Sequence, residues 1–170
     1  TNYFLQIIHK ALKKDGILRL VLPDADLFYE AYLQKRYEFF ELFESKINFP
    51  IEDSQKLDYL FIHLMATPKS YKKAFNKGKY ELSKIREKLE KLNKEEFLDY
   101  LIEDINENSL IGHEHINWFN YEKLEKKLKQ AGFKEIYRSG FGQSRTAPMR
   151  EIPLFDGTLP CFSLYVEAVK

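Results

Sequence analysis

Three short stretches of the sequence carry side chains of the types that bind ligands or move protons. Asp24 follows the aliphatic run ILRLVLP, His113 and His115 flank a glutamate in HEH, and Ser144 and Arg145 are adjacent in GFGQSR. A carboxylate can orient an acceptor group, a histidine can act as a general base or a hydrogen-bond donor, and a guanidinium can bind an anion. For these groups to act on one ligand, the fold must bring the stretches together.

Each candidate also has a purely structural interpretation. Asp24 has the residue type and position of a helix N-cap. His115 could tie a helical insertion to a sheet, and Arg145 could form a surface ion pair. The two histidines of HEH have no third metal ligand nearby in the sequence, so no metal site is predicted there.

The elements around Asp24 are typical of an α/β fold. Residues 3–14 have apolar side chains at helical spacing, and residues 17–22 form a strand that is apolar apart from Arg19. A strand of this kind is expected in a sheet that is covered on both faces. Open α/β sheets bind their ligands beyond the carboxyl ends of the strands, and Asp24 follows such an end.

The last third of the chain returns to the same pattern. Asn120 can cap a helix over residues 121–131, and Gly132 can end that helix. Strands are predicted over residues 133–139 and 162–169, joined by a long ordered loop with several glycines and prolines. The chain therefore has α/β character at both ends.

The middle of the chain is predicted to be helical. The segments KYELSKIREKLEKLN and KEEFLDYLIEDINEN carry apolar residues at helical spacing. We therefore assign residues 1–44 and 112–170 to an α/β domain and residues 45–111 to a helical insertion. The lysine-rich and glutamate-rich runs of this insertion are predicted to be solvated helix faces.

Charge and composition limit the classes of partner. The 170 residues include 27 basic and 26 acidic side chains, for a net charge of +1, so no global field attracts nucleic acid or an anionic membrane. We expect neither as a partner. The one cysteine, Cys161, fits a reducing compartment, and a cytoplasmic location is predicted from it.

The segments ALKKDGILRLVLPD, HINWFNYEKLEKKLKQAGF, GFGQSR and CFSLYVEAVK, in this order, resemble the carboxy-terminal half of a class I S-adenosylmethionine-dependent methyltransferase. The closest likeness is to bacterial methyltransferase-like proteins, and it covers residues 2–35 and 113–170. It implies a partial Rossmann-like sheet of three mixed strands. Residues 17–22, 133–139 and 162–169 would be the fifth, sixth and seventh strands, with the seventh antiparallel and between the other two.

The resemblance also implies an activity and roles for the candidate residues. The reaction would be methyl transfer from S-adenosylmethionine to an unidentified small-molecule or sugar acceptor. His115 matches a histidine of the family just before the sixth-strand helix and, with Asp24, would be catalytic. Arg145 and Ser144 would bind the acceptor, and the helical insertion over residues 45–111 would be the lid that shapes the acceptor pocket. Because the candidate residues would all lie at or beyond the carboxyl ends of strands, Asp24, His115 and Arg145 are expected to converge on one side of the sheet.

One part of the family pattern does not occur in this sequence. The family holds the cofactor on a glycine-rich loop after its first strand, and no GxGxG motif is present here; Gly140-Phe141-Gly142 follows the wrong strand and opens no helix. We therefore expect the cofactor-binding half to be absent and the chain alone to bind no cofactor. It would be a fragment, a split gene product or a degenerate homologue.

Two further expectations follow from that missing half. The first is an alternative function, in which the chain is a non-catalytic binding module or a partner subunit of another methyltransferase. The second concerns the strand over residues 17–22, which would leave one edge unpaired, so we expect self-association through this edge.

Overall fold

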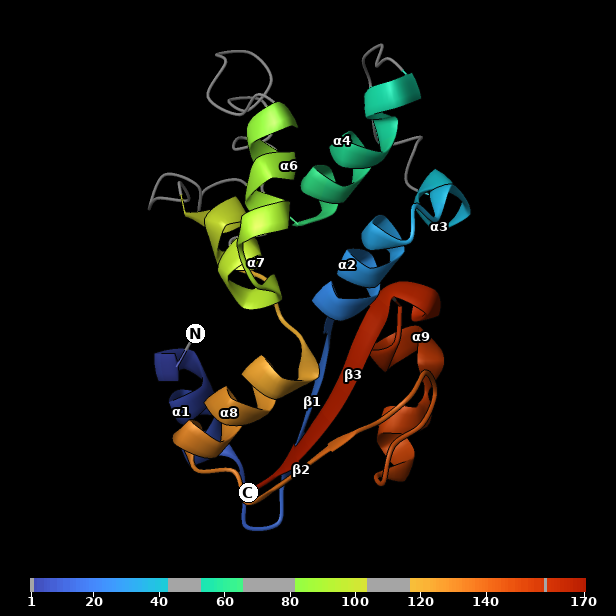
Figure 1. Ribbon diagram of the computed structural model, residues 1–170. Coiled ribbons are helices and arrows are strands. Elements are labelled where there is room, and N and C mark those ends of the chain that lie inside the picture. The colour runs from blue at the N-terminus through green and yellow to red at the C-terminus, as the bar shows by residue number, and fades with distance from the viewer. Residues whose placement is uncertain (1, 43–52, 66–81, 104–116, 158) are drawn as a thin grey trace. The chain divides into compact units, whose positions relative to one another are not determined.

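The computed structural model describes residues 2–42, 53–65, 82–103, 117–157 and 159–170. The chain divides into two compact units (Figure 1). Thr1–Asp24 and Phe119–Lys170 form the α/β unit, and Ala25–Trp118 form the helical unit. The residue boundaries predicted near 44 and 112 lie outside the described residues, and the segment after Asp24 belongs to the helical unit.

The α/β unit contains one small sheet and several helices. Its elements are α1 (Asn2–Ala11), β1 (Ile17–Pro23), α8 (Tyr121–Ala131), β2 (Glu135–Arg138), the 3-10 helix η3 (Ala147–Arg150), α9 (Ile152–Phe155), the 3-10 helix η4 (Pro160–Phe162) and β3 (Ser163–Val169). Helix α1 packs against α8, and α8 packs against β2 and β3. The long segment between β2 and β3, predicted as an ordered loop, contains the three short helices.

Strand β3 lies between β1 and β2 and runs antiparallel to both. Val169 lies opposite Ile17 on one side and Glu135 on the other, and Ser163 lies opposite Pro23 at the other end. The predicted central position and direction of the last strand are confirmed. The expected mixed pairing is not found, because β1 and β2 run in the same direction but are separated by β3, so every pair among the described strands is antiparallel.

The two faces of the sheet have different chemistry because side chains alternate along each strand. Leu18, Leu20 and Leu22 of β1 pack against the hydrophobic core that α1 and α8 form with the sheet, together with Val166 of β3. We call this side the helix face. Arg19 belongs to the other set of β1 residues, and it bonds Gly140, Gln143 and Asp156 of the segment between β2 and β3. We call this opposite side the loop face.

Helix α8 begins and ends at the residues that the sequence predicted. The side chain of Asn120 accepts a hydrogen bond of 2.9 Å from the amide of Lys123, which caps the first turn. Gly132 ends the helix with a left-handed backbone, at a φ of 106°. The imidazole of His9 from α1 lies directly beside this glycine and packs edge-on against Phe133.

Replacing Gly132 by alanine is expected to lower the free energy of unfolding by about 1–2 kcal/mol, because an L-residue is strained in the left-handed region. The new Cβ would also lie 3.0 Å from the His9 ring. Gly157→Ala is the matched control, since its Cβ would meet no atom within 4 Å. Urea denaturation of both variants checks the difference, and equal stabilities would contradict this account.

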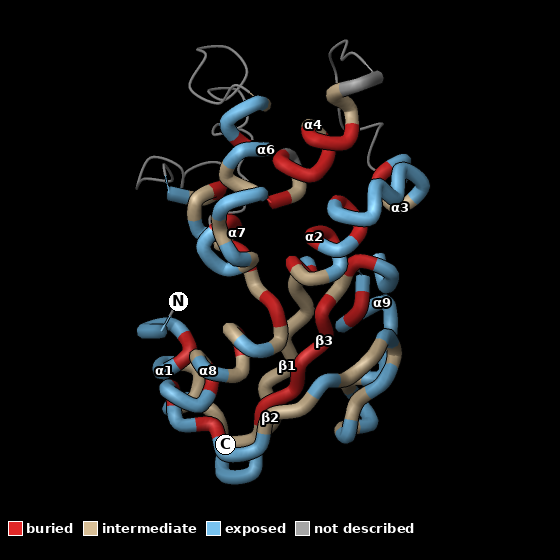
Figure 2. Tube along the Cα trace, in the orientation of Figure 1, coloured by how far each residue is buried: buried red, intermediate tan, exposed pale blue. Residues whose placement is uncertain are grey.

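The helical unit is built from α2 (Ala25–Leu33), α3 (Tyr37–Glu41), α4 (Asp53–Met65), α6 (Leu82–Lys91) and α7 (Lys94–Ile102). Figure 2 shows buried residues along α2, α4 and α7. The ring of Phe61 stacks on Tyr32 and lies parallel to Phe97, so aromatic side chains from three helices form its core. Asn93 and Glu96 form a capping box at the start of α7.

The helical pattern predicted to continue from residue 27 toward residue 43 is interrupted. Lys35 adopts a φ of 54° between α2 and α3, so the chain turns there instead of continuing one helix. No helix among the described residues is long and apolar enough to cross a membrane.

Candidate functional site

Asp24 lies directly after the carboxyl end of β1, as the sequence predicted. Its amide donates a hydrogen bond of 2.9 Å to the carbonyl of Phe162, just before β3, and its side chain is buried, with 4% of the residue exposed. Asp24 therefore lies beyond the carboxyl end of a strand, where α/β sheets bind their ligands, but its side chain is enclosed by protein. In the chain it also immediately precedes α2, the position of an N-cap.

Arg145 lies at the opposite end of the sheet. Its guanidinium forms an ion pair with Glu135, the first residue of β2, and lies 3.9 Å above the ring of Tyr137. Glu135 is level with Val169 and Ile17, whereas Asp24 lies beyond the pair of Pro23 and Ser163. At about 3.3 Å for each residue along a strand, the two ends are roughly 20 Å apart.

The expected convergence of Asp24 and Arg145 is therefore wrong for this structure. The physical reason is that the chain after β2 folds back over the loop face instead of continuing beyond the strand end. Both partners of the Arg145 ion pair have about half of their side-chain surface exposed, which is the surface ion pair that the sequence left open as the alternative.

Ser144 lies near the same folded-back segment, and its side chain serves local structure. Its hydroxyl oxygen accepts a hydrogen bond of 3.0 Å from the amide of Thr146, and the hydroxyl also hydrogen-bonds Glu167 of β3. The role of Ser144 in acceptor binding stays a prediction. His115, the second predicted catalytic residue, lies outside the described residues, as does His113.

The loop face contains a buried charged cluster that the sequence analysis did not identify. Arg19 of β1 has only 3% of its side chain exposed, and it forms ion pairs of 2.8 Å with Asp156 and 2.9 Å with Glu167, both of which are fully buried. The guanidinium of Arg19 also donates hydrogen bonds to the carbonyls of Gly140 and Gln143 and to the hydroxyl of Ser139. We call Arg19, Asp156 and Glu167 the buried charge cluster.

The two carboxylates of the cluster hold different parts of the loop segment. Asp156 accepts two hydrogen bonds from Arg19, of 3.0 and 2.8 Å, and one of 2.6 Å from the amide of Gly142. Glu167 accepts from the hydroxyl of Tyr137 at 2.5 Å and from the amide of Arg145 at 3.3 Å. The cluster therefore fastens the segment between β2 and β3 to the middle of the sheet.

Ionisation of the cluster is favoured despite its burial. Burial alone opposes the charged form of Asp156, but the hydrogen bonds from Arg19 and from the amide of Gly142 outweigh it, so the pKa of Asp156 is lowered. Burial also opposes the charged form of Glu167, but hydrogen bonds from Ser144, Tyr137, the amide of Arg145 and Arg19 lower its pKa. Burial and the bond to Glu167 raise the pKa of Tyr137 to about 12. Arg19, Asp156 and Glu167 are thus all charged at neutral pH.

A local signal for part of this cluster exists in the sequence. Arg19 interrupts an otherwise aliphatic strand, and Glu167 interrupts the last strand in the same way. Charged residues at positions predicted to be buried indicate an ion pair across the sheet. Asp156 has no comparable signal, because it lies in an irregular segment.

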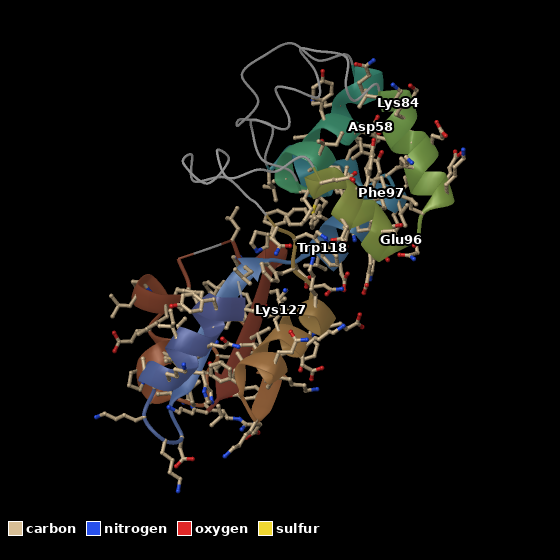
Figure 3. The ribbon with its side chains drawn as sticks, turned by 90° about the vertical axis from the view of Figure 1, so that its left-hand side faces the viewer. Asp58, Lys84, Glu96, Phe97, Trp118 and Lys127 are labelled. Atoms are coloured by element: carbon tan, nitrogen blue, oxygen red, sulfur yellow. The ribbon has the colours of Figure 1, made fainter. Side chains whose placement is uncertain are left out.

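The helical unit has a smaller polar cluster of its own. Buried Asp58 of α4 accepts hydrogen bonds from the hydroxyl of Tyr32 and, at 2.6 Å, from Arg86 of α6 (Figure 3 labels Asp58 and Phe97). Burial, followed by the bond to Asp58, raises the pKa of Tyr32. The Asp58 carboxylate thus links three helices.

Neither cluster has the composition of a metal centre. Among the residues that the structure describes, no group of three histidine, cysteine, aspartate or glutamate side chains could hold a metal ion. Because its charged groups bond one another and the loop segment, the buried charge cluster is a structural clamp. The role of Asp24 in ligand chemistry stays a prediction.

No family model, no curated protein and no solved structure matches the chain.

Proposed function

We propose that this chain is the carboxy-terminal portion of a methyltransferase that uses S-adenosylmethionine. The observation that supports the proposal is the order β1-β3-β2, with the last strand of the chain antiparallel and between the other two. The resemblance to class I methyltransferases implies this order for the fifth, sixth and seventh strands. Helices α1 and α8 cover one face of the sheet, in keeping with the same assignment.

In the proposed reaction a nucleophile of a small-molecule or sugar acceptor attacks the methyl group of the sulfonium cofactor in line. The protein's main contribution is to hold the two reactants in contact and in line. Asp24, at the carboxyl end of β1, would orient the acceptor, and His115 stays the predicted base that takes its proton. The residues that would hold the cofactor are not assigned in this chain, which contains no GxGxG motif.

The proposal includes a location in the cell and a choice of the residue that contacts the acceptor. Cys161 is an exposed free thiol, which is compatible with a reducing, cytoplasmic location. Because Arg145 lies at the other end of the sheet from Asp24, the acceptor contact that we propose for this chain is through Asp24.

The test uses the whole product of the gene, purified from its own cells with a carboxy-terminal tag so that any preceding polypeptide is retained. Calorimetry with S-adenosylhomocysteine should then show saturable binding with a Kd of about 100 μM or tighter, equivalent to roughly 5–6 kcal/mol. Absence of binding by this whole product overturns the proposal. Binding by the 170-residue chain alone would instead contradict the expected absence of the cofactor-binding half.

Asp24→Asn is expected to slow methyl transfer by the whole product at least about ten-fold while leaving S-adenosylhomocysteine binding within about two-fold. The reason is that the amide keeps the shape of the side chain but loses the charge that orients the acceptor. Asp15→Asn is the matched control, an exposed acid at the opposite end of β1. Transfer from labelled S-adenosylmethionine to small-molecule extracts measures both variants, and equal rates would remove Asp24 from the site.

A second candidate function is the non-catalytic binding module. It is favoured by the apolar side chains that α1 exposes, Tyr3, Phe4 and Ile7, which have exposed fractions of 77%, 60% and 46%. Such a module would bind a partner protein but would not bind S-adenosylhomocysteine. The calorimetric experiment therefore separates the two functions.

A further inference from the structure

The charge of the chain is distributed unequally between its two units. The α/β unit has 13 basic and 8 acidic side chains, a net charge of +5, whereas the helical unit has 14 basic and 18 acidic side chains, a net charge of −4. The net charge of +1 for the whole chain is the sum of these opposite values. The expectation that nucleic acid is no partner rested on that sum, so it does not apply to the α/β unit by itself.

Within the α/β unit the excess of positive charge lies on α8, on β2 and on the segment that follows β2. Residues 121–150 contain eight basic and three acidic side chains. Two of these acids are already paired, Glu125 with Lys129 and Glu135 with Arg145. The exposed basic residues of this stretch, which we call the basic surface, are Lys126, Lys129, Lys134, Arg138, Arg145 and Arg150.

The basic surface surrounds β2, which among the described strands is at the edge of the sheet away from β1 (Figure 1). Helix α8 packs against β2 on the helix face. Arg138, the last residue of β2, lies over the ring of Tyr121 of α8, with its guanidinium carbon 4.9 Å from the ring centre. On the loop face, Arg145 lies over the ring of Tyr137. Each face of this edge strand therefore has an arginine that is held over a tyrosine.

These two arginines are suited to bind phosphate groups. A guanidinium that already lies over an aromatic ring has less side-chain freedom to lose, and its planar N–H groups match the oxygens of a phosphate. Arg138 is exposed, and 52% of the side chain of Arg145 is exposed, so both are accessible to a ligand. The ion pair of Arg145 with Glu135 is at the surface, and such a pair costs little to break.

We propose that the basic surface binds a single-stranded nucleic acid through its phosphates. The arginine and tyrosine planes beside β2 can also stack on unpaired bases, which a duplex does not offer. A membrane-binding surface would insert apolar side chains among the lipids, but no large apolar residue is exposed in the described stretch from Tyr121 through Arg138.

This inference does not rest on the proposed methyl transfer. Any preceding strands of the same sheet would pair with β1, and β3 separates β1 from β2. Such strands would therefore leave the basic surface uncovered.

Fluorescence anisotropy of the whole product of the gene with a labelled oligouridylate of about 12 nucleotides tests the proposal. In about 50 mM salt we expect a Kd of roughly 1–50 μM. The slope of log affinity against log salt should be about −2 to −3, equivalent to three or four phosphate contacts. An oligothymidylate of the same length distinguishes the sources: affinities within about five-fold assign the surface to either single strand, and a larger preference for oligouridylate assigns it to RNA.

Arg138→Ala and Arg145→Ala should each weaken binding at least about five-fold and make the salt slope shallower by about 0.7. Lys84→Ala is the matched control, because it removes one positive charge from an exposed site of the helical unit (Figure 3 labels Lys84). It should leave the affinity within about two-fold. Near-ultraviolet circular dichroism verifies that each variant is folded.

Absence of binding in about 50 mM salt overturns the proposal. An equal loss of affinity in Lys84→Ala also overturns it, because the attraction would then depend on net charge alone. Sedimentation with vesicles of phosphatidylserine and phosphatidylcholine tests the other polyanionic partner. Vesicle binding that is tighter than oligonucleotide binding and is lost in Arg138→Ala would assign the basic surface to an anionic membrane and overturn the proposal.

Discussion

Replacing Arg19 by methionine is expected to lower the free energy of unfolding of the α/β unit by about 3–5 kcal/mol. The change keeps the length of the side chain but leaves the fully buried carboxylates of Asp156 and Glu167 without their cation. It also removes the donors to the carbonyls of Gly140 and Gln143. Chemical denaturation followed by near-ultraviolet circular dichroism measures the loss.

Two further variants make this expectation specific to the buried geometry. Arg19→Lys keeps the charge but not the planar fork, so its loss should be smaller than that of Arg19→Met but still clear. Arg145→Ala breaks the exposed ion pair with Glu135 and should leave stability nearly unchanged. If Arg19→Met were no more destabilising than Arg145→Ala, the cluster would not be the clamp described above.

The order of the strands and the ends of α8 could be predicted because their signals are local or are carried by the resemblance. Asn120 and Gly132 act on the turns next to them, so the sequence around each residue contains the physical cause. The central position of β3 followed from the resemblance to methyltransferases. Lys35 shows the limit of periodicity, since its left-handed backbone ends α2 within a pattern that continues to look helical.

The candidate site was less predictable because its geometry depends on contacts between distant residues. Arg19 and Asp156 are 137 positions apart, and their pairing draws the segment after β2 back across the sheet. This path of the backbone places Arg145 next to Glu135 and away from Asp24. Loops usually lie beyond the carboxyl ends of strands, and this rule could locate Asp24, which directly follows β1. It could not locate Arg145, which is seven positions beyond the last residue of β2.

Acid is expected to weaken the wild-type protein and to reduce the difference between wild type and Arg19→Met. The folded-state pKa values of Asp156 and Glu167 are lowered, so their contribution is fully present above the unfolded values near pH 4. It is lost as the pH falls below about 4 through the folded values. The wild-type stability should therefore be nearly level from about pH 7 to 5 and should fall below that range.

In Arg19→Met the sign of the dependence should reverse for Asp156, because the hydrogen bond from Arg19 is the largest influence that lowers its pKa. Burial, the largest influence on Asp156 overall, raises its pKa once the guanidinium is gone. Glu167 keeps its hydrogen bonds from Ser144, Tyr137 and the amide of Arg145, so its pKa should change less. A group with a raised folded pKa binds more protons in the folded state, so the folded state gains stability as the pH decreases from about 7 toward 4. Denaturation at each pH should show the two stabilities approaching each other as the pH is lowered. A difference that stays constant over this range would mean that the Asp156 carboxylate does not depend on Arg19 for its ionisation.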